Sequence, residues 1–223
     1  SVLAFTEAHV GQKLVVDDVL IGPDEGQHGP DMLFIVVDAR DSQVLFESAA
    51  DEVRPIASLT KLASALAFLS QNPDLDSEYT VKPGDLVNGA RLYLMSGDRV
   101  KKGDLLKLAL VASANEAAQA LAGAAGLTVG DFVGAMNRIA GQLNLADTKF
   151  VDPTGIGAGN VSTAREVALL AKAAIERPEI REALALPAIE FQTLAGRSVN
   201  AISTDSLLKR YPEAGVDLIG GKP

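Results

Sequence analysis

The order of hydrophobic and polar residues predicts strands near the two ends of the chain and helices between them. An apolar run rich in β-formers covers 32–37, a polar turn follows, and 43–47 resumes a strand pattern, so the two runs together predict a hairpin. After Pro187 the pattern returns to β, and 216–219 is expected to be a strand. Residues 1–30 have a loop-like composition in part and are expected to form a short lead-in with one strand or helix.

Helical spacing of apolar residues marks the middle of the chain. The expected helices are 58–69, 104–112, 113–124, 128–143 and 163–177. Thr163 and Glu166 form a capping-box pattern for the last of these, which Pro178 is expected to end. Strands at both ends with helices between them predict an α+β fold, in which one sheet is built from both termini and a helical subdomain covers about 72–195 of a domain spanning 31–223.

Composition narrows the possible chemistry. The 223 residues are enough for one substantial domain, and the net charge of −9 argues against a nucleic-acid partner. Cysteine is absent, which removes disulfides, cysteine nucleophiles and thiolate metal sites. A Ser-His-Asp triad would need one of only two histidines, His9 or His28. No run of 18 apolar residues and no signal peptide is visible, so no bilayer-spanning segment is expected.

One pair of residues suggests a serine nucleophile that works without histidine. Ser58 and Lys61 are three apart, which places them one turn apart on the same face of a helix. A serine hydroxyl needs a base within hydrogen-bond reach, and Lys61 can serve if burial lowers its pKa enough to make it neutral. The alternative is a helix-capping serine with a solvated lysine, and a second Ser-x-x-Lys at Ser206–Lys209 shows how weak this motif is alone.

Two further motifs follow in a fixed order. Ser113-Ala114-Asn115 comes after an apolar run, and Gly220-Gly221-Lys222 comes at the end. With Ser58-Leu59-Thr60-Lys61 and the segments 150–156 and 160–165, they resemble D-alanyl-D-alanine carboxypeptidases. These are low-molecular-mass penicillin-binding proteins of the DD-peptidase/serine β-lactamase superfamily. The resemblance covers about 32–222, most of the chain.

The resemblance implies a three-layer αβα fold with an antiparallel sheet and assigns roles to the motif residues. Ser58 is the nucleophile and Lys61 its base. Ser113 passes a proton to the leaving amine, Asn115 binds the substrate amide, and Lys222 binds the terminal carboxylate and lowers the pKa of Lys61. The family expects Lys-Thr-Gly or Lys-Ser-Gly where this chain has Lys222-Pro223, which implies a variant motif or a chain that ends before the family's last strands.

The implied function is a serine-type D-Ala-D-Ala carboxypeptidase. It would act on peptidoglycan pentapeptides through an acyl-enzyme on Ser58, be acylated by β-lactams, and use no metal or organic cofactor. It would be exported to the periplasmic or extracellular face of the bacterial envelope, with membrane attachment through segments absent from this chain. A D,D-endopeptidase of the same family and a non-catalytic peptidoglycan-binding protein on the same fold remain open. A class A β-lactamase is disfavoured, because Glu166-Val167-Ala168-Leu169-Leu170 lacks the asparagine of the Glu-x-x-Leu-Asn element.

Overall fold

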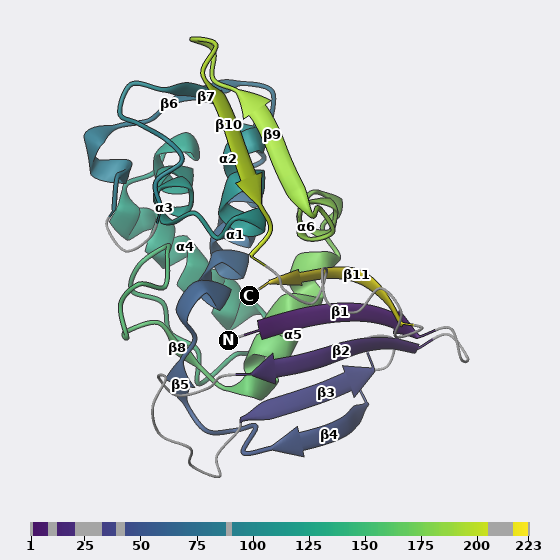
Figure 1. The fold of residues 1–223 in the computed structure, drawn as a ribbon. Coiled ribbons are helices and arrows are strands. Elements are labelled where there is room, and N and C mark those ends of the chain that lie inside the picture. The colour runs from purple at the N-terminus through teal and green to yellow at the C-terminus, as the bar shows by residue number, and fades with distance from the viewer. Residues whose placement is uncertain are drawn as a thin grey trace.

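A five-stranded antiparallel sheet built from both ends of the chain packs against a group of helices (Figure 1). The computed structural model describes residues 2–8, 13–20, 33–38, 43–87, 91–204 and 216–222. The strands of the sheet are β1 (Val2–Ala8), β2 (Lys13–Leu20), β3 (Phe34–Asp38), β4 (Val44–Ser48) and β11 (Val216–Lys222). Their order is β11-β1-β2-β3-β4, so the α+β class and the sheet shared by both termini are confirmed.

The first segment of the chain contributes more to the sheet than its composition suggests. Both β1 and β2 lie within 1–30, where one strand or helix is expected. In addition, β1 is an inner strand, paired with β2 on one side and with β11 on the other, where Leu3 is opposite Lys222. That pairing joins the two ends of the chain, and no local pattern of residues encodes it. The β3–β4 hairpin forms as predicted.

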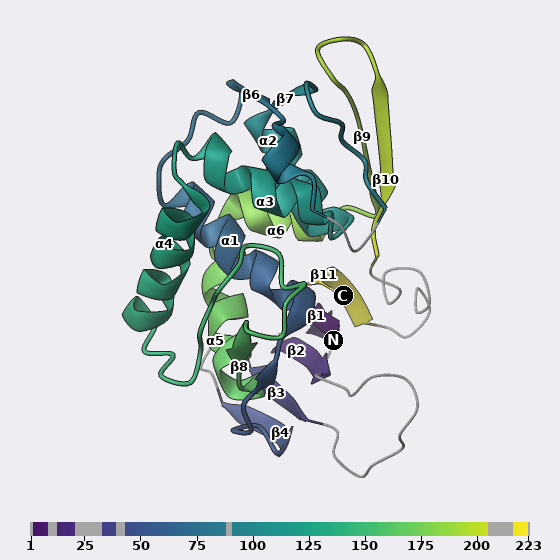
Figure 2. The ribbon, with the colours of Figure 1, turned by 90° about the vertical axis from the view of Figure 1, so that its left-hand side faces the viewer.

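Six α-helices follow in chain order. They are α1 (Thr60–Leu69), α2 (Lys102–Val111), α3 (Asn115–Ala124), α4 (Val129–Gln142), α5 (Ala164–Ile175) and α6 (Pro178–Leu184). All ten residues of α1 are buried, and α2, α3, α4 and α5 pack around it. A helix buried on every side is expected to be apolar all round, so polar side chains within it need a specific reason. Helix α5 lies against β2 and β3, and α6 lies against β11 (Figures 1 and 2).

One helix is not expected from the sequence. Pro178 ends α5 as predicted, but it also begins α6, because the first position of a helix has no intrahelical partner for its N–H. Three short two-stranded pairs complete the fold: β5 (Arg54–Pro55) with β8 (Val161–Ser162), β6 (Glu78–Thr80) with β7 (Arg99–Lys101), and β9 (Ala188–Gln192) with β10 (Ser198–Ile202). No helix in the described ranges is both long enough and apolar enough to cross a bilayer.

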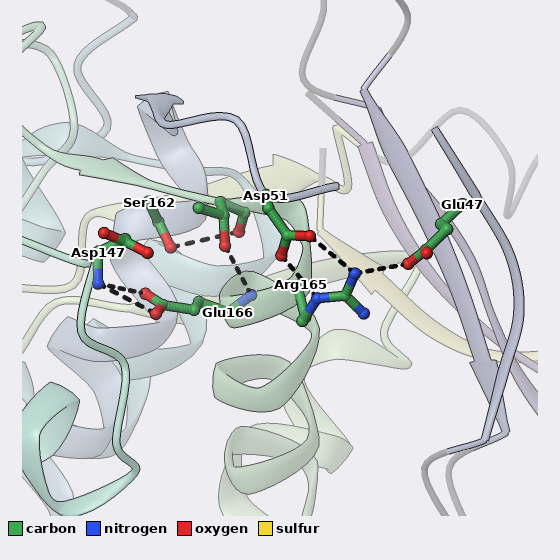
Figure 3. A network of polar contacts seen from close by, with 7 residues as sticks. Glu47, Asp51, Asp147, Ser162, Arg165 and Glu166 are labelled. Carbon is green, nitrogen blue, oxygen red and sulfur yellow. Dashed lines mark hydrogen bonds and ion pairs between the residues drawn. The ribbon is translucent and has the colours of Figure 1, made fainter. Parts of the chain in front are cut away.

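The start of α5 is attached to two neighbouring segments (Figure 3). The Thr163 hydroxyl accepts a hydrogen bond from the Glu166 N–H (3.1 Å), which confirms the predicted N-cap. The reciprocal half of the capping box does not form, because the Glu166 carboxylate instead accepts from the N–H of Asp147 (3.0 Å) and the hydroxyl of Thr148 (2.6 Å). Glu166 therefore serves the loop before α5.

Arg165, the next residue back, extends the attachment toward the sheet (Figure 3). Its guanidinium pairs with Asp51 (2.7 Å) and with Glu47 of β4 (2.7 Å). All three side chains are substantially exposed, so each pair contributes at most about 1 kcal/mol to stability. The contacts nevertheless join α5 to the end of β4.

Candidate active site

Ser58 lies in a strained turn directly before the central helix. A single 3₁₀ turn, η1 (Ala57–Leu59), leads into α1. Ala57 has φ = 45°, in the left-handed region that residues other than glycine rarely adopt and that recurs at functional sites. The Ser58 side chain is half-buried, whereas Leu59 beside it is fully buried and anchors the turn. The turn therefore presents the predicted nucleophile at the margin of the core.

Lys61 lies one turn further along and is buried, as a general base must be. Its side chain is 1% exposed, and its Nζ donates a hydrogen bond to the carbonyl oxygen of Thr154 (2.8 Å). Burial lowers the pKa of Lys61 to about 8, while the carboxylates of Asp152 and Glu116 act in the opposite direction. With this pKa, roughly one Lys61 side chain in ten is neutral at pH 7.

The loop 151–160 closes over the start of α1. The Asp152 carboxylate accepts hydrogen bonds from the N–H groups of Thr154 (2.7 Å) and Gly155 (2.8 Å). Burial acts to raise the pKa of Asp152, but the hydrogen bonds outweigh it and the pKa is lowered. The Ser64 hydroxyl donates to the Pro153 carbonyl oxygen (2.7 Å), so α1 holds this loop at Ser64 as well as at Lys61. The structure thus gives Asp152-Pro153-Thr154-Gly155 the turn-forming role predicted from its residue types.

Asn160 joins the same loop to both sides of the nucleophile turn. It is fully buried, and its carbonyl oxygen accepts from the N–H of Ile56 (3.0 Å), before the turn. Its side-chain nitrogen donates to the Thr60 hydroxyl (3.1 Å), after the turn, while its side-chain oxygen accepts from the N–H of Val151 (2.6 Å). Sequence reasoning placed Asn160 in a family-like segment but missed this role. A lone asparagine among glycines reads as an ordinary turn residue.

The second motif lies at the junction of α2 and α3. Ser113 has φ = 55° and is half-buried between the two helices. Asn115 begins α3 and is 8% exposed, so the helix starts two residues later than predicted. Helix α3 packs on α1, and the charge of Glu116, the residue after Asn115, acts on Lys61. The structure therefore brings the start of the second motif beside the lysine of the first.

The third motif is described only through its backbone. Lys222 is the last residue of β11 and pairs in register with Leu3 of β1. The C-terminal end of β11 lies at the end of the sheet that faces the helices (Figures 1 and 2). The Lys222 side chain, Pro223 and both histidines lie outside what the structure describes. The role of Lys222 stays a prediction.

Comparison with known proteins agrees with this arrangement. The sequence model of the peptidase S11 family, described as D-alanyl-D-alanine carboxypeptidase, matches residues 30–219. The chain is 34% identical to a D-alanyl-D-alanine endopeptidase of Haemophilus influenzae over 79% of this chain and 61% of that protein. It is 30% identical to the D-alanyl-D-alanine carboxypeptidase DacB2 of Mycobacterium tuberculosis over 87% of this chain and 66% of that protein.

Solved structures give the same result. The crystal structure of a D-alanyl-D-alanine carboxypeptidase from M. tuberculosis superposes with a TM-score of 0.75 at 28% identity, covering 88% of this chain and 75% of that one. The DD-transpeptidase of Streptomyces K15 superposes with a TM-score of 0.74 at 27% identity, covering 84% and 79%. The chain spans only 48–61% of the length of the H. influenzae and Escherichia coli endopeptidases that it matches.

Proposed function

The chain belongs to the D-alanyl-D-alanine carboxypeptidase family, peptidase family S11, and from this premise we propose that it is a serine-type D-Ala-D-Ala carboxypeptidase working through Ser58. The observation that carries the proposal is Lys61. A fully buried lysine one turn from a half-buried serine, with a pKa lowered to about 8, supplies the base that a serine nucleophile needs. A merely structural lysine would gain nothing from this burial, which costs free energy.

The proposed reaction has two balanced steps. Neutral Lys61 accepts the Ser58 hydroxyl proton while Oγ attacks the carbonyl carbon of the penultimate D-alanine. The C–N bond then breaks, Ser113 passes a proton from Lys61 to the leaving amine of the last D-alanine, and an acyl ester remains on Ser58. Water hydrolyses this ester by the same proton transfers in reverse. Asn115 binds the substrate amide, Lys222 binds its terminal carboxylate, and the Ser58 N–H is one donor to the oxyanion.

A D,D-endopeptidase is the second candidate, favoured by the H. influenzae relative of that name. The same residues would cut a cross-link between two stem peptides, and the shape of the pocket would decide between the activities. In either case we propose peptidoglycan ending in D-Ala-D-Ala as substrate, β-lactams as covalent inhibitors, and a site of action on the periplasmic or extracellular face of the cell envelope. A non-catalytic peptidoglycan-binding protein is the alternative of a different class.

Acylation by penicillin tests the proposal directly. We expect fluorescent penicillin to label the protein and to add one antibiotic to its intact mass, because a β-lactam acylates the same serine as the substrate. Ser58→Ala is expected to abolish the adduct, whereas Ser206→Ala, which removes the serine of the second Ser-x-x-Lys, is expected to keep it. Folded protein without any adduct would contradict the proposal and favour the binding protein. Release of D-alanine from a pentapeptide, compared with cleavage of a cross-linked dimer, then separates the two activities.

A further inference from the structure

Glu116 is buried beside the proposed catalytic lysine and is only half satisfied. It follows Asn115 in the first turn of α3 and is 0% exposed. Its Oε1 accepts a hydrogen bond from the N–H of Tyr93 (2.7 Å), while its Oε2 is buried and has no hydrogen-bond partner among the described residues. A buried carboxylate oxygen without a donor carries a desolvation cost of about 1–3 kcal/mol or more, so its presence calls for a reason.

Charge is rare in this core. Within the described part of the chain, the buried charged residues are Lys61, Asp85 and Glu116. Asp85 has local partners, since its carboxylate accepts from the Tyr79 hydroxyl (2.8 Å) and the Lys82 N–H (2.8 Å). Lys61 and Glu116 are therefore the buried cation and the buried anion whose charges are not satisfied within one local turn, and the field of Glu116 acts on Lys61.

The other groups around Lys61 complete the electrostatic setting. From the loop 151–160 comes Asp152, whose carboxylate is already bound by two N–H groups of its own turn. The buried residues of α2, α4 and α5, which pack on α1, are apolar. On the far side of Glu116, Arg197 donates to the Tyr93 carbonyl oxygen (3.1 Å) and pairs with Asp98. Arg197 therefore has a carboxylate of its own.

We propose that Glu116 is a positioning residue of the active site, which stabilises the protonated Lys61 formed during acylation and holds the segment 91–95 against the second motif through Tyr93. The inference rests on the proposed function. When the Ser58 O–H bond breaks, its proton arrives on a buried amine, and a positive charge forms where water cannot solvate it. The Glu116 carboxylate is pre-oriented for that charge, because its Tyr93 bond and the first turn of α3 hold it in place.

Glu116→Gln isolates the charge from the shape. Glutamine keeps the size and the acceptor for the Tyr93 N–H but removes the negative charge, so the neutral form of Lys61 becomes more favourable. The rate of acylation by a fluorescent penicillin, measured against pH, rises as Lys61 loses its proton. We expect this acidic limb to move to lower pH by roughly one unit in the variant. At pH 7 the neutral fraction would rise from about one-tenth to about one-half, and the acylation rate would rise up to about fivefold.

Matched variants distinguish the outcomes. Asp85→Asn removes the other buried carboxylate and is expected to leave the limb in place, and Glu116→Asp, which keeps the charge, is expected to restore it. If Glu116→Gln does not fold, Glu116→Met replaces it, because a thioether needs no hydrogen-bond donor. A folded, uncharged variant whose limb coincides with that of the unsubstituted protein would overturn the inference. Failure of the unsubstituted protein to be acylated at any pH would instead overturn the proposed function.

Discussion

Gly155→Ala is expected to destabilise the protein by about 3 kcal/mol or more. Gly155 has φ = +84°, and a Cβ built there would lie 1.8 Å from the carbonyl oxygen of Ala57 and 3.0 Å from the Thr60 hydroxyl oxygen. The backbone strain of alanine at this φ accounts for about 1 kcal/mol. Moving the Ala57 backbone away from the new methyl adds a packing cost of about 1–3 kcal/mol or more. Urea unfolding monitored by circular dichroism measures the sum.

Gly196→Ala is the matched control for this substitution. Gly196 has φ = +82°, but nothing lies within 4 Å of a Cβ built there. This variant should show the strain alone, about 1 kcal/mol. Equal losses for the two variants would contradict the claim that Gly155 is needed because the loop 151–160 approaches the nucleophile turn so closely.

The same close approach gives Gly155 an expected effect on catalysis. The methyl would displace Ala57, the residue before Ser58, and a shift of about 1 Å in a reacting group can lower a rate by about a hundredfold. We therefore expect Gly155→Ala that remains folded to be acylated by penicillin about a hundredfold more slowly, while Gly196→Ala retains the rate. This combination would assign the loop a role in placing the nucleophile as well as in stability.

These contacts show where sequence patterns are informative and where they stop. The helix after Ser58, the helix beginning near Thr128 and the β3–β4 hairpin follow from apolar spacing and local capping, which are properties of neighbouring residues. The place of β1 in the sheet and the Asn160 hydrogen bonds depend on partners far along the chain. Local periodicity contains no information on such pairings.

The candidate site divides in the same way. Ser58, Lys61, Ser113 and Asn115 could be proposed because their short motifs occur in a recognisable order, and the structure places the start of the second motif beside Lys61. Glu116 could not be proposed, because a glutamate in the first turn of a helix is normally explained by the helix dipole. Only its complete burial and its single hydrogen bond distinguish it from an ordinary surface residue.

Lys61→Met is expected to lower the acylation rate by about 10²–10⁴-fold and to change how stability depends on pH. Methionine fills a similar volume but cannot accept the Ser58 proton, and loss of a general base typically costs this much rate. Stopped-flow acylation with a fluorescent penicillin measures the loss. A Lys61→Met protein acylated as fast as the unsubstituted one would show that another group removes the serine proton.

The pH dependence follows from the difference between the two states of Lys61. Its pKa is about 8 in the folded protein and 10.5 for an ordinary lysine, so between these values the unfolded chain holds a proton that the folded chain has lost. The free energy of unfolding therefore rises as pH increases from 8 to 10.5, by about 3 kcal/mol in total, and Lys61 contributes no slope below pH 8. Burial also raises the pKa of Tyr79, which lowers stability above about pH 10, but the two proteins share that effect. We expect urea unfolding at pH 7.5, 8.5 and 9.5 to show a gain for the unsubstituted protein that Lys61→Met lacks. Parallel stability curves for the two proteins would mean that Lys61 keeps its ordinary pKa in the folded state, and the argument for Lys61 as a base would lose its physical support.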